Sequence, residues 1–257
     1  MYDYLDLTMT QKTVVITGGN RGIGRDITKT FLDAGYHVVV GARNESGLVA
    51  EFGDKVTFVK IDVRNEADHN LLVDTAIRLT GRFDCYVNNA GFSEWRPIEE
   101  IDEDFFNNLI NTNLKGAFWG CKAAAAKLDA KGTIINISSL AGKRGSSNNS
   151  AYVASKFGMN GLTQSLAKEL GPRQIRVNAL CPVLISTDGL LDALKSPFAP
   201  ANGDPEKFIS NFAAGNAALK RLPTGLEVGN MCVFLDSQAA SAITGQCINV
   251  DCGVLPQ

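Results

Sequence analysis

Several features that mark common protein classes are missing from this sequence of 257 residues. Its six cysteines form no CxxC pair and have no histidine cluster beside them, so neither a zinc site nor a redox motif is indicated. No apolar stretch approaches the ~20 residues of a membrane helix, and the start MYDYLDLTMTQK lacks the pattern of a secretory signal. We therefore expect a cytoplasmic protein with reduced thiols, no metal and no membrane partner.

A strong charge of one sign is also absent. The 25 Lys and Arg residues nearly balance the 27 Asp and Glu residues, for a formal net charge of -2, which disfavours nucleic acid as a partner. Internal repeats, low-complexity tracts and Pro/Ser-rich linkers are missing too, so we expect one domain over residues 1–257. Residues 1–8 precede the first strand-like segment and would form a mobile extension.

What the sequence does contain is a series of seven apolar, β-branched runs that alternate with longer helix-like segments. Near-continuous apolar strands are typical of a parallel sheet that is covered on both faces. The pattern predicts an α/β protein with a doubly wound, seven-stranded parallel sheet and helices on both faces, the Rossmann fold. The runs cover residues 13–17, 37–42, 56–62, 84–90, 132–138, 175–182 and 246–251.

A glycine-rich turn, TGGNRGIG at 17–24, directly follows the first run and precedes a helix-like segment. Glycines there allow a sharp turn and a close backbone approach to a pyrophosphate, while the helix N-terminus supplies N–H groups and a favourable dipole. We interpret it as a dinucleotide-binding turn, with a purely structural turn as the alternative. Its expected cofactor contacts are Gly18, Asn20, Arg21, Gly22, Ile23 and Gly24.

The end of the second run indicates which cofactor is bound. An acidic side chain there would hold the ribose hydroxyls of NAD, whereas a basic one would hold the 2′-phosphate of NADP. The sequence places Arg43 at this point and no carboxylate beside it, and Arg21 would add a second positive charge. NADP(H) is therefore expected rather than NAD(H), unless both arginines are solvated surface residues.

Two further strand ends carry polar residues. Asp62 would accept a hydrogen bond from the adenine amino group, with Val63 alongside, or would simply form a turn. At 88–91 the segment NNAG closes the fourth run, where small residues permit backbone contact with a ribose. We expect Asn89, Ala90 and Gly91 to contact the cofactor, while Asn88 would alternatively brace the sheet.

Tyr152 and Lys156 lie four residues apart in the helix-like segment SAYVASKFGMNGL, so both side chains project from one face. A phenol near its ordinary pKa of ~10 is a poor acid at neutral pH, but a nearby ammonium stabilises the phenolate and lowers that pKa. The pair would supply a general acid and base. Without its context, the same spacing is an ordinary amphipathic helix face.

Two more polar residues fall near this pair in the expected fold. Ser139 ends the fifth run thirteen positions before Tyr152 (152 − 139 = 13) and would hold a carbonyl oxygen as charge develops on it. Its neighbour Ser138 points the other way in an extended chain and is the weaker candidate. Asn113 would bind a water behind Lys156 and connect that lysine to solvent.

Together these residues resemble the short-chain dehydrogenase/reductase family from about Thr13 to Gly253. TGGNRGIG is similar to the family's TGxxxGxG turn, and NNAG is similar to its fourth-strand motif. The family's four catalytic positions are matched in order and spacing by Asn113, Ser139, Tyr152 and Lys156. In that family the tyrosine is the general acid and base, the serine positions the substrate, and the lysine also binds the nicotinamide ribose.

The resemblance implies further cofactor contacts at Tyr152, Lys156, Pro182, Ile185 and Thr187, and it implies that Arg43 selects NADP. The implied reaction transfers the 4-pro-S hydride of the nicotinamide to a carbonyl carbon. Two long helices, near 103–128 and 151–170, resemble the interface of the family's tetramers and dimers. A homotetramer is expected, with a homodimer as the alternative.

The sequence departs from the family pattern at two positions. Val183 follows Pro182 where the family usually has glycine, which would restrict the backbone on the nicotinamide side. Cys252 replaces the first glycine of a common VDGG motif and would alter that turn or an oligomer contact. Neither change removes a catalytic group.

The segment after Pro182 is interpreted as a substrate lid over about 188–215, with an irregular stretch near 195–208 that three prolines and a glycine interrupt. A passive surface loop is the alternative, and Trp95 would either contact the substrate or anchor a packed surface. The predicted function is NADPH-dependent reduction of a ketone or aldehyde. The rival predictions are an NAD-dependent alcohol dehydrogenase and a nucleotide-sensing protein without catalysis.

Overall fold

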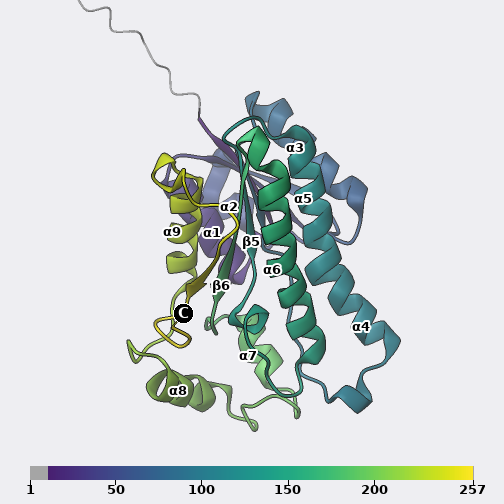
Figure 1. Cartoon of the computed structure of the whole chain (residues 1–257), viewed down its shortest axis with the longest axis vertical. Helices are drawn as coiled ribbons and strands as arrows, with labels where there is room; N and C mark the ends of the chain where they lie inside the picture. The colour runs from purple at the N-terminus through teal and green to yellow at the C-terminus, as the bar shows by residue number, and fades with distance from the viewer. Residues whose placement is uncertain (1–10, 257) are drawn as a thin grey trace, which may run out of the picture.

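The computed structural model describes residues 11–256, so the predicted extension at 1–8 lies outside the described residues. Seven parallel strands form one sheet in the order β3-β2-β1-β4-β5-β6-β7 (Figure 1). The predicted doubly wound, seven-stranded parallel sheet is confirmed. The strands are β1 (Thr13–Thr17), β2 (His37–Ala42), β3 (Val56–Lys60), β4 (Cys85–Asn88), β5 (Thr133–Ile137), β6 (Arg176–Pro182) and β7 (Cys247–Val250).

Helices cover both faces of the sheet. On one face α1 and α9 pack together, and on the other face α3, α5 and α6 lie side by side (Figure 1). The α-helices are α1 (Gly22–Asp33), α2 (Leu48–Phe52), α3 (Glu66–Thr80), α4 (Glu103–Ile110), α5 (Gly116–Lys127), α6 (Ser150–Leu170), α7 (Asp188–Leu194), α8 (Pro205–Asn216) and α9 (Gly225–Asp236).

The apolar strands bury both of their faces, which explains their near-continuous hydrophobicity. In β1, Val14 and Ile16 belong to the core beneath α1 and α9, whereas Val15 belongs to the core beneath α3, α5 and α6. Successive residues of a strand point to opposite faces, so every position of such a strand is apolar when both faces are covered. Val14, Val15 and Ile16 are all fully buried.

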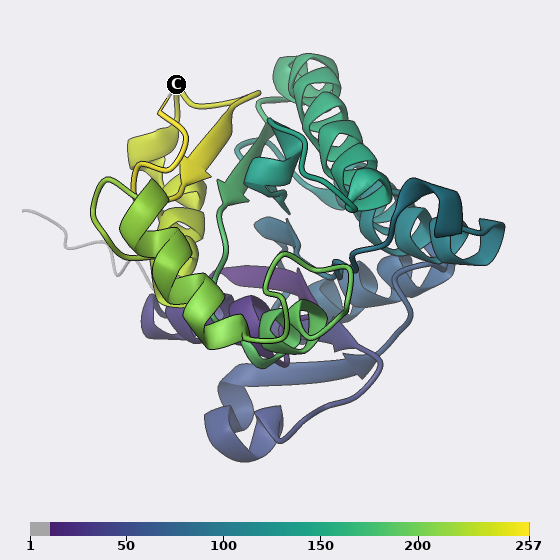
Figure 2. The same ribbon diagram turned by 90° about the horizontal axis from the view of Figure 1, so that it is seen from below.

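The strand order reverses between β1 and β4, because β2 and β3 continue on one side of β1 and β5 to β7 continue beyond β4. In open α/β sheets a ligand crevice forms at such a switch point, outside the carboxyl ends of the strands. The segment that carries α7 and α8 lies across this end of the sheet and stands in front of it in Figure 2. The fold therefore places the predicted motifs and the predicted lid at one edge.

Two expected elements differ in detail. The irregular stretch predicted near 195–208 ends earlier, because α8 begins at Pro205 and the Asp204 side chain accepts a hydrogen bond from the N–H of Lys207. Proline is well suited to the first position of a helix, so it starts α8 rather than interrupting it. The long helix predicted near 103–128 is α4 and α5, joined by a π-helical turn at Asn111–Lys115.

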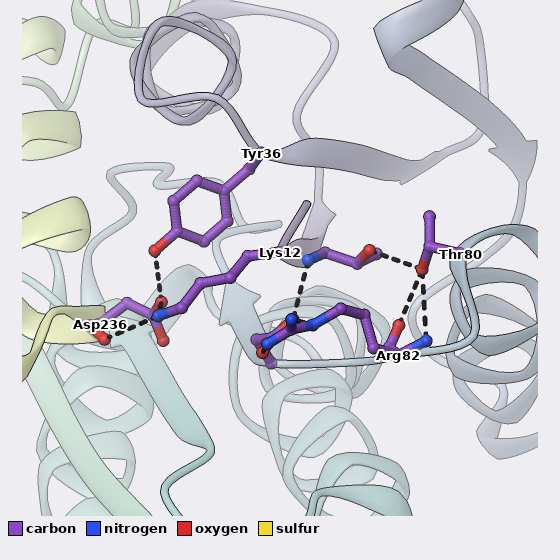
Figure 3. Close-up of polar contacts among 7 residues, drawn as sticks. Lys12, Tyr36, Thr80, Arg82 and Asp236 are labelled. Atoms are coloured by element: carbon purple, nitrogen blue, oxygen red, sulfur yellow. Dashed lines mark hydrogen bonds and ion pairs between the residues drawn. The ribbon is translucent and has the colours of Figure 1, made fainter. Parts of the chain in front are cut away.

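The amino end of the sheet is held by buried and part-buried polar contacts (Figure 3). The carboxylate of Asp236, at the end of α9, accepts hydrogen bonds from the hydroxyl of Tyr36 at 2.6 Å and from Nζ of Lys12 at 2.9 Å. Near them, the hydroxyl of Thr13 donates to that of Thr80 at 2.6 Å. The Asp236 contacts tie α9 to the starts of β1 and β2, and the Thr13 contact ties β1 to the end of α3, at the edge opposite the crevice.

No helix within residues 11–256 combines the length and the apolar character that a membrane crossing requires.

Candidate active site

A cleft of about 1240 Å³ opens at the carboxyl ends of the strands. Ligand pockets commonly measure ~300–1000 Å³, so this cleft has room for a dinucleotide together with a substrate. The structure brings nearly all of the predicted site residues to its wall, and among the predicted set Asn113 alone lies behind it. The lining includes Gly18, Asn20, Arg21, Gly22, Ile23, Gly24, Arg43, Asp62, Val63, Asn89, Ala90, Gly91, Ser139, Tyr152, Lys156, Pro182, Ile185 and Thr187.

The glycine turn after β1 needs its glycines for specific reasons. Gly18 and Gly22 have φ values of +65° and +50°, which side chains on L-residues disfavour. A Cβ on Gly24 would lie 2.0 Å from the carbonyl oxygen of Gly18, so only glycine lets α1 pack this closely on the turn. The amide of Asn89 donates to the carbonyl oxygens of Thr17 at 2.9 Å and Gly18 at 3.1 Å, which braces the turn from β4.

One arginine directly follows β2, Arg43, and another, Arg21, lies in the glycine turn. Arg21 and Arg43 are exposed and line the cleft. Glu45, the nearest acidic residue in the sequence after β2, uses its carboxylate to accept a hydrogen bond from the N–H of Val49 at 2.6 Å. The loop is also held by Asn20, whose amide donates to the carbonyl oxygen of Asn44 at 2.8 Å. The end of β2 therefore presents positive charge to the cleft.

Asp62 lies just beyond β3 and forms a turn. Its carboxylate accepts hydrogen bonds from the backbone N–H and from Nε of Arg64, each at 3.0 Å. The hydrogen bond from the Arg64 side chain is the largest cause that lowers the pKa of Asp62. The turn-forming alternative for Asp62 is thus confirmed, and a contact with adenine stays a prediction.

Asn88 points into the protein rather than into the cleft. Its amide donates to Oδ1 of Asn136 on β5 at 2.9 Å, and the amide of Asn136 donates to the hydroxyl of Thr163 on α6 at 2.9 Å. All three residues are buried. The structure thus confirms the bracing role of Asn88, although through side chains and not through the backbone.

Ser139, Tyr152 and Lys156 meet between β5 and α6. The hydroxyl of Ser139 accepts a hydrogen bond from the N–H of Ala141 at 3.0 Å and forms a side-chain hydrogen bond with Tyr152. Nζ of Lys156 donates to the carbonyl oxygen of Ile137 at 2.8 Å and lies 5.7 Å from the centre of the Tyr152 ring. The helical spacing of four residues brings the two side chains together, as predicted.

The pKa of Tyr152 differs from the expectation. Burial raises the pKa of Tyr152, and the hydrogen bond from Ser139 offsets this only in part. Burial also lowers the pKa of Lys156 to about 8. The predicted lowering of the Tyr152 pKa is therefore wrong, because burial is the largest cause acting on this pKa and raises it.

Ser138 and Asn113 have structural contacts. The hydroxyl of Ser138 donates to the carbonyl oxygen of Lys156 at 3.4 Å, although Ser138 also lines the cleft. Asn113 is fully buried in the π-helical turn and exchanges two hydrogen bonds with the backbone of Phe92, at 2.8 and 3.0 Å. Asn113 therefore anchors the loop after β4, and a proton relay from it to Lys156 stays a prediction.

Similarity to known proteins agrees with this arrangement. Residues 18–255 match the family described as Enoyl-(Acyl carrier protein) reductase. L-2,3-butanediol dehydrogenase of Corynebacterium glutamicum is 32% identical over 260 residues, which cover 95% of this chain and 98% of that protein. 3beta-hydroxysteroid dehydrogenase 2 of Eggerthella lenta is 34% identical over 252 residues, 94% of each chain. The chain belongs to the short-chain dehydrogenase/reductase family.

Solved structures of other short-chain dehydrogenases/reductases share the fold closely. The ligand-free aldohexose dehydrogenase of Thermoplasma acidophilum superposes with a TM-score of 0.86 at 31% identity, over 97% of this chain and 98% of that one. An actinorhodin polyketide ketoreductase with NADPH gives a TM-score of 0.87 at 29% identity, over 96% and 98% of the two chains. These relatives identify the chain as an oxidoreductase of the NAD(P)-dependent class.

The nucleotide end of this short-chain dehydrogenase/reductase fits such a cofactor. Helix α1 begins after Arg21, whose side chain forms no capping hydrogen bond, so the first N–H groups of α1 are left for a ligand. A Cβ on Gly18 would lie 3.1 Å from Cα of Ala90, so only glycine lets this turn pack closely against the loop after β4. A pyrophosphate would occupy this cradle.

The two departures from the family pattern have different outcomes. Val183 lies outside the left-handed region, and its N–H donates to the carbonyl oxygen of Val250 at 3.3 Å, so the backbone needs no glycine here. Cys252 has a φ of +54°, a conformation that suits glycine. The cysteine therefore occupies a backbone conformation that favours glycine, and an altered turn or oligomer contact stays a prediction.

Trp95 packs into the predicted lid. It is 6% exposed and belongs to a cluster with Leu194, Ala199 and Ala201. A second tie runs from the amide of Asn148 to the carbonyl oxygen of Phe198 at 3.1 Å. The packing agrees with the anchor alternative for Trp95 and attaches the predicted lid to the loop after β4. Because Trp95 also lines the cleft, its contact with the substrate stays a prediction.

Sequence reasoning missed the buried residues that hold the site from behind. Asn136 and Thr163 support Asn88, and His69 on α3 contacts both Tyr86 and the backbone of Val63. A histidine among apolar residues of a helix carries no local signal of such a contact. A polar residue within a buried strand, such as Tyr86, was the available hint that a partner was needed.

Proposed function

We propose that the chain is an NADPH-dependent reductase of a ketone or aldehyde, which also oxidises the corresponding alcohol in reverse. The observation that carries the proposal is that Ser139, Tyr152 and Lys156 line the same cleft as the glycine turn and two exposed arginines. One end of the cleft suits a nucleotide that carries an extra phosphate. The other end suits proton transfer to an oxygen atom.

The family's nicotinamide cofactor, when bound, supplies a hydride from the 4-pro-S position to the carbonyl carbon. In the proposal, the turn from Gly18 to Gly24 holds its pyrophosphate, while Arg21 and Arg43 hold the 2′-phosphate. The adenosine would lie against Asp62 and Val63, and the ribose and nicotinamide against the remaining predicted contacts. These are Asn89, Ala90, Gly91, Tyr152, Lys156, Pro182, Ile185 and Thr187, all of which line the cleft.

The proton chemistry belongs to the side chains between β5 and α6. Because burial raises the pKa of Tyr152, its hydroxyl holds its proton at neutral pH and can donate it to a carbonyl oxygen that gains negative charge. Ser139, already hydrogen-bonded to Tyr152, would donate a second hydrogen bond to that oxygen. The ammonium of Lys156 would stabilise the tyrosinate that forms, since it lies over the Tyr152 ring.

The experiment that tests this function is a panel of ketones and aldehydes followed by oxidation of NADPH, repeated with NADH and with Tyr152→Phe. We expect turnover with NADPH, a clear preference over NADH, and no turnover by the variant although it still binds the cofactor. A preference for NADH would instead support an NAD-dependent alcohol dehydrogenase. Cofactor binding without turnover of any substrate would support a nucleotide sensor.

We also propose a homotetramer, with a homodimer as the alternative outcome. Its support is an exposed phenylalanine on each of three neighbouring helices, Phe106 on α4, Phe118 on α5 and Phe157 on α6, which are 43%, 46% and 47% exposed. Apolar side chains exposed in this way favour burial by a partner. Light scattering measures the mass, and a monomer would contradict the proposal. We also propose that the chain forms a single domain. The six free cysteines support a cytoplasmic location, where thiols stay reduced.

A further inference from the structure

A buried histidine links the middle of the sheet to the adenosine end of the cleft. His69, in the second turn of α3, has no solvent exposure. Its Nδ1 lies 2.7 Å from the hydroxyl of Tyr86 on β4, and its Nε2 lies 2.8 Å from the carbonyl oxygen of Val63. Val63 lines the cleft, whereas His69 and Tyr86 stand behind it. The histidine thus fixes a backbone group of the cleft wall.

The partners decide which nitrogen carries the proton. A carbonyl oxygen only accepts hydrogen bonds, so Nε2 must carry hydrogen and donate to Val63. Burial lowers the pKa of His69, which favours the neutral ring. In the neutral ring Nδ1 is then an acceptor, and the hydroxyl of Tyr86 donates to it. Tyr86 therefore sets the tautomer that His69 needs in order to hold Val63.

Asp68, the residue before His69, holds the backbone of Asp62, the residue before Val63. Oδ2 of Asp68 accepts a hydrogen bond from the N–H of Asp62 at 2.7 Å. From the other side, Gly116 at the start of α5 lies so close that a Cβ on it would be 3.1 Å from the Val63 carbonyl oxygen. The segment at Asp62 and Val63 is thus held from α3 and supported from α5. Its position depends on side chains that never reach the cleft.

We propose that His69 is a positioning residue for the nucleotide, which, oriented by Tyr86, holds Val63 where the adenosine half of the cofactor binds. This inference rests on the proposed cofactor site, and it adds a residue pair outside the cleft that sets nucleotide affinity. It predicts that losing the Tyr86 hydroxyl weakens nucleotide binding and leaves proton transfer by Tyr152 unchanged.

Tyr36 provides a matched control. Its hydroxyl makes a similarly short hydrogen bond, 2.6 Å to Asp236 (Figure 3). Tyr36 lies just before β2, at the amino end of the sheet, and does not line the cleft. Tyr86→Phe and Tyr36→Phe each remove one buried hydroxyl and keep the ring. The Tyr86 ring still packs edge-on against Phe83, with ring centres 6.2 Å apart, so the substitution leaves the core filled.

The experiment measures binding of adenosine 2′,5′-bisphosphate and of NADPH to the full chain by calorimetry, together with kcat at saturating NADPH. One net hydrogen bond changes an equilibrium by about 3- to 10-fold, so Tyr86→Phe should raise both Kd values by about that factor and leave kcat unchanged. His69→Leu should raise both Kd values at least as much. His69→Gln, which keeps a donor and an acceptor, should restore most of the affinity.

Tyr36→Phe should lower the melting temperature and leave both Kd values at the wild-type level. Wild-type Kd values for folded Tyr86→Phe and His69→Leu would overturn the proposal. Equal weakening by Tyr36→Phe would also overturn it, because the effect would then be general loosening of the fold. Binding of the bisphosphate requires no turnover, so a protein that binds it but reduces no carbonyl contradicts the proposed function and leaves the role of His69 measurable.

Discussion

Nζ of Lys156 lies 2.8 Å from the carbonyl oxygen of Ile137, the last residue of β5. The end of the strand thus holds the lysine in place over the ring of Tyr152. A buried ammonium is costly unless an acceptor faces it, and the strand end supplies that acceptor. The geometry of the proposed acid therefore depends on the sheet as well as on α6.

The first prediction concerns the pH dependence of carbonyl reduction. The pKa of Lys156 is lowered to about 8, so the ammonium is present below that pH and is lost above it. Because the charge stabilises the tyrosinate that forms, kcat/KM for reduction should fall as the pH rises through about 8. Stopped-flow or steady-state rates from pH 6 to 10 measure this. A profile that stays flat to pH 10 contradicts the role of Lys156.

The second prediction concerns the 2′-phosphate. Hydrogen bonds to charged groups are worth about 1.5–3 kcal/mol, so Arg43→Ala should raise the Kd of NADPH by about 10- to 100-fold. The Kd of NADH should change little, since NADH lacks the phosphate. Arg78→Ala is the control, because Arg78 is an exposed arginine of α3 that does not line the cleft. Equal losses for NADPH and NADH would place Arg43 elsewhere on the cofactor.

The third prediction concerns strain at Cys252. A residue other than glycine in the left-handed region costs about 1–2 kcal/mol, and glycine regains this minus its larger loss of backbone entropy. Cys252→Gly should therefore raise the free energy of unfolding by about 0.5–1 kcal/mol in urea titrations. Cys252→Ala removes the thiol but keeps the Cβ, so it should give no gain. A similar gain in both variants would assign the effect to the thiol.

The fourth prediction concerns alkaline stability. Burial, followed by the Asp236 charge, raises the pKa of Tyr36 above its ordinary value. A raised pKa in the folded state gives stability that is fully present below the unfolded pKa of ~10 and is lost as the pH rises above it.

Tyr36→Phe should accordingly cost about 1.5–3 kcal/mol at pH 8, because it removes a hydrogen bond to a carboxylate. Above pH 10 its melting temperature should decline less steeply than that of the wild type. Melting curves by circular dichroism from pH 8 to 11 test both statements. Parallel declines in the two proteins would show that Tyr36 does not titrate during unfolding.

Much of the fold was predictable because its signals are local. Apolar strands, the glycine turn and the spacing of Tyr152 and Lys156 each depend on a few neighbouring residues. The position of α8 was harder, because Pro205 is a helix breaker inside a helix but a good first residue at its start. Only the cap at Asp204 distinguishes the two cases.

The properties that could not be predicted are those set by distant parts of the chain. The pKa of Tyr152 depends on how completely the whole fold removes it from water, and that depth is absent from the motif. The contact between His69 and Tyr86 joins residues seventeen positions apart (86 − 69 = 17) through the register of α3 on the sheet. The identity of neither residue indicates which partner it contacts.

The packing of Trp95 within the predicted lid means that the two cannot separate without a spectroscopic change. If the segment at α7 and α8 lifts to admit a substrate, the indole loses Leu194 and Ala199 and meets water. The sequence has two tryptophans, and the other, Trp119, lies on α5 beside Phe118. The protein thus carries an internal fluorescent probe, and we expect its emission to shift to the red if this segment lifts away from the cleft.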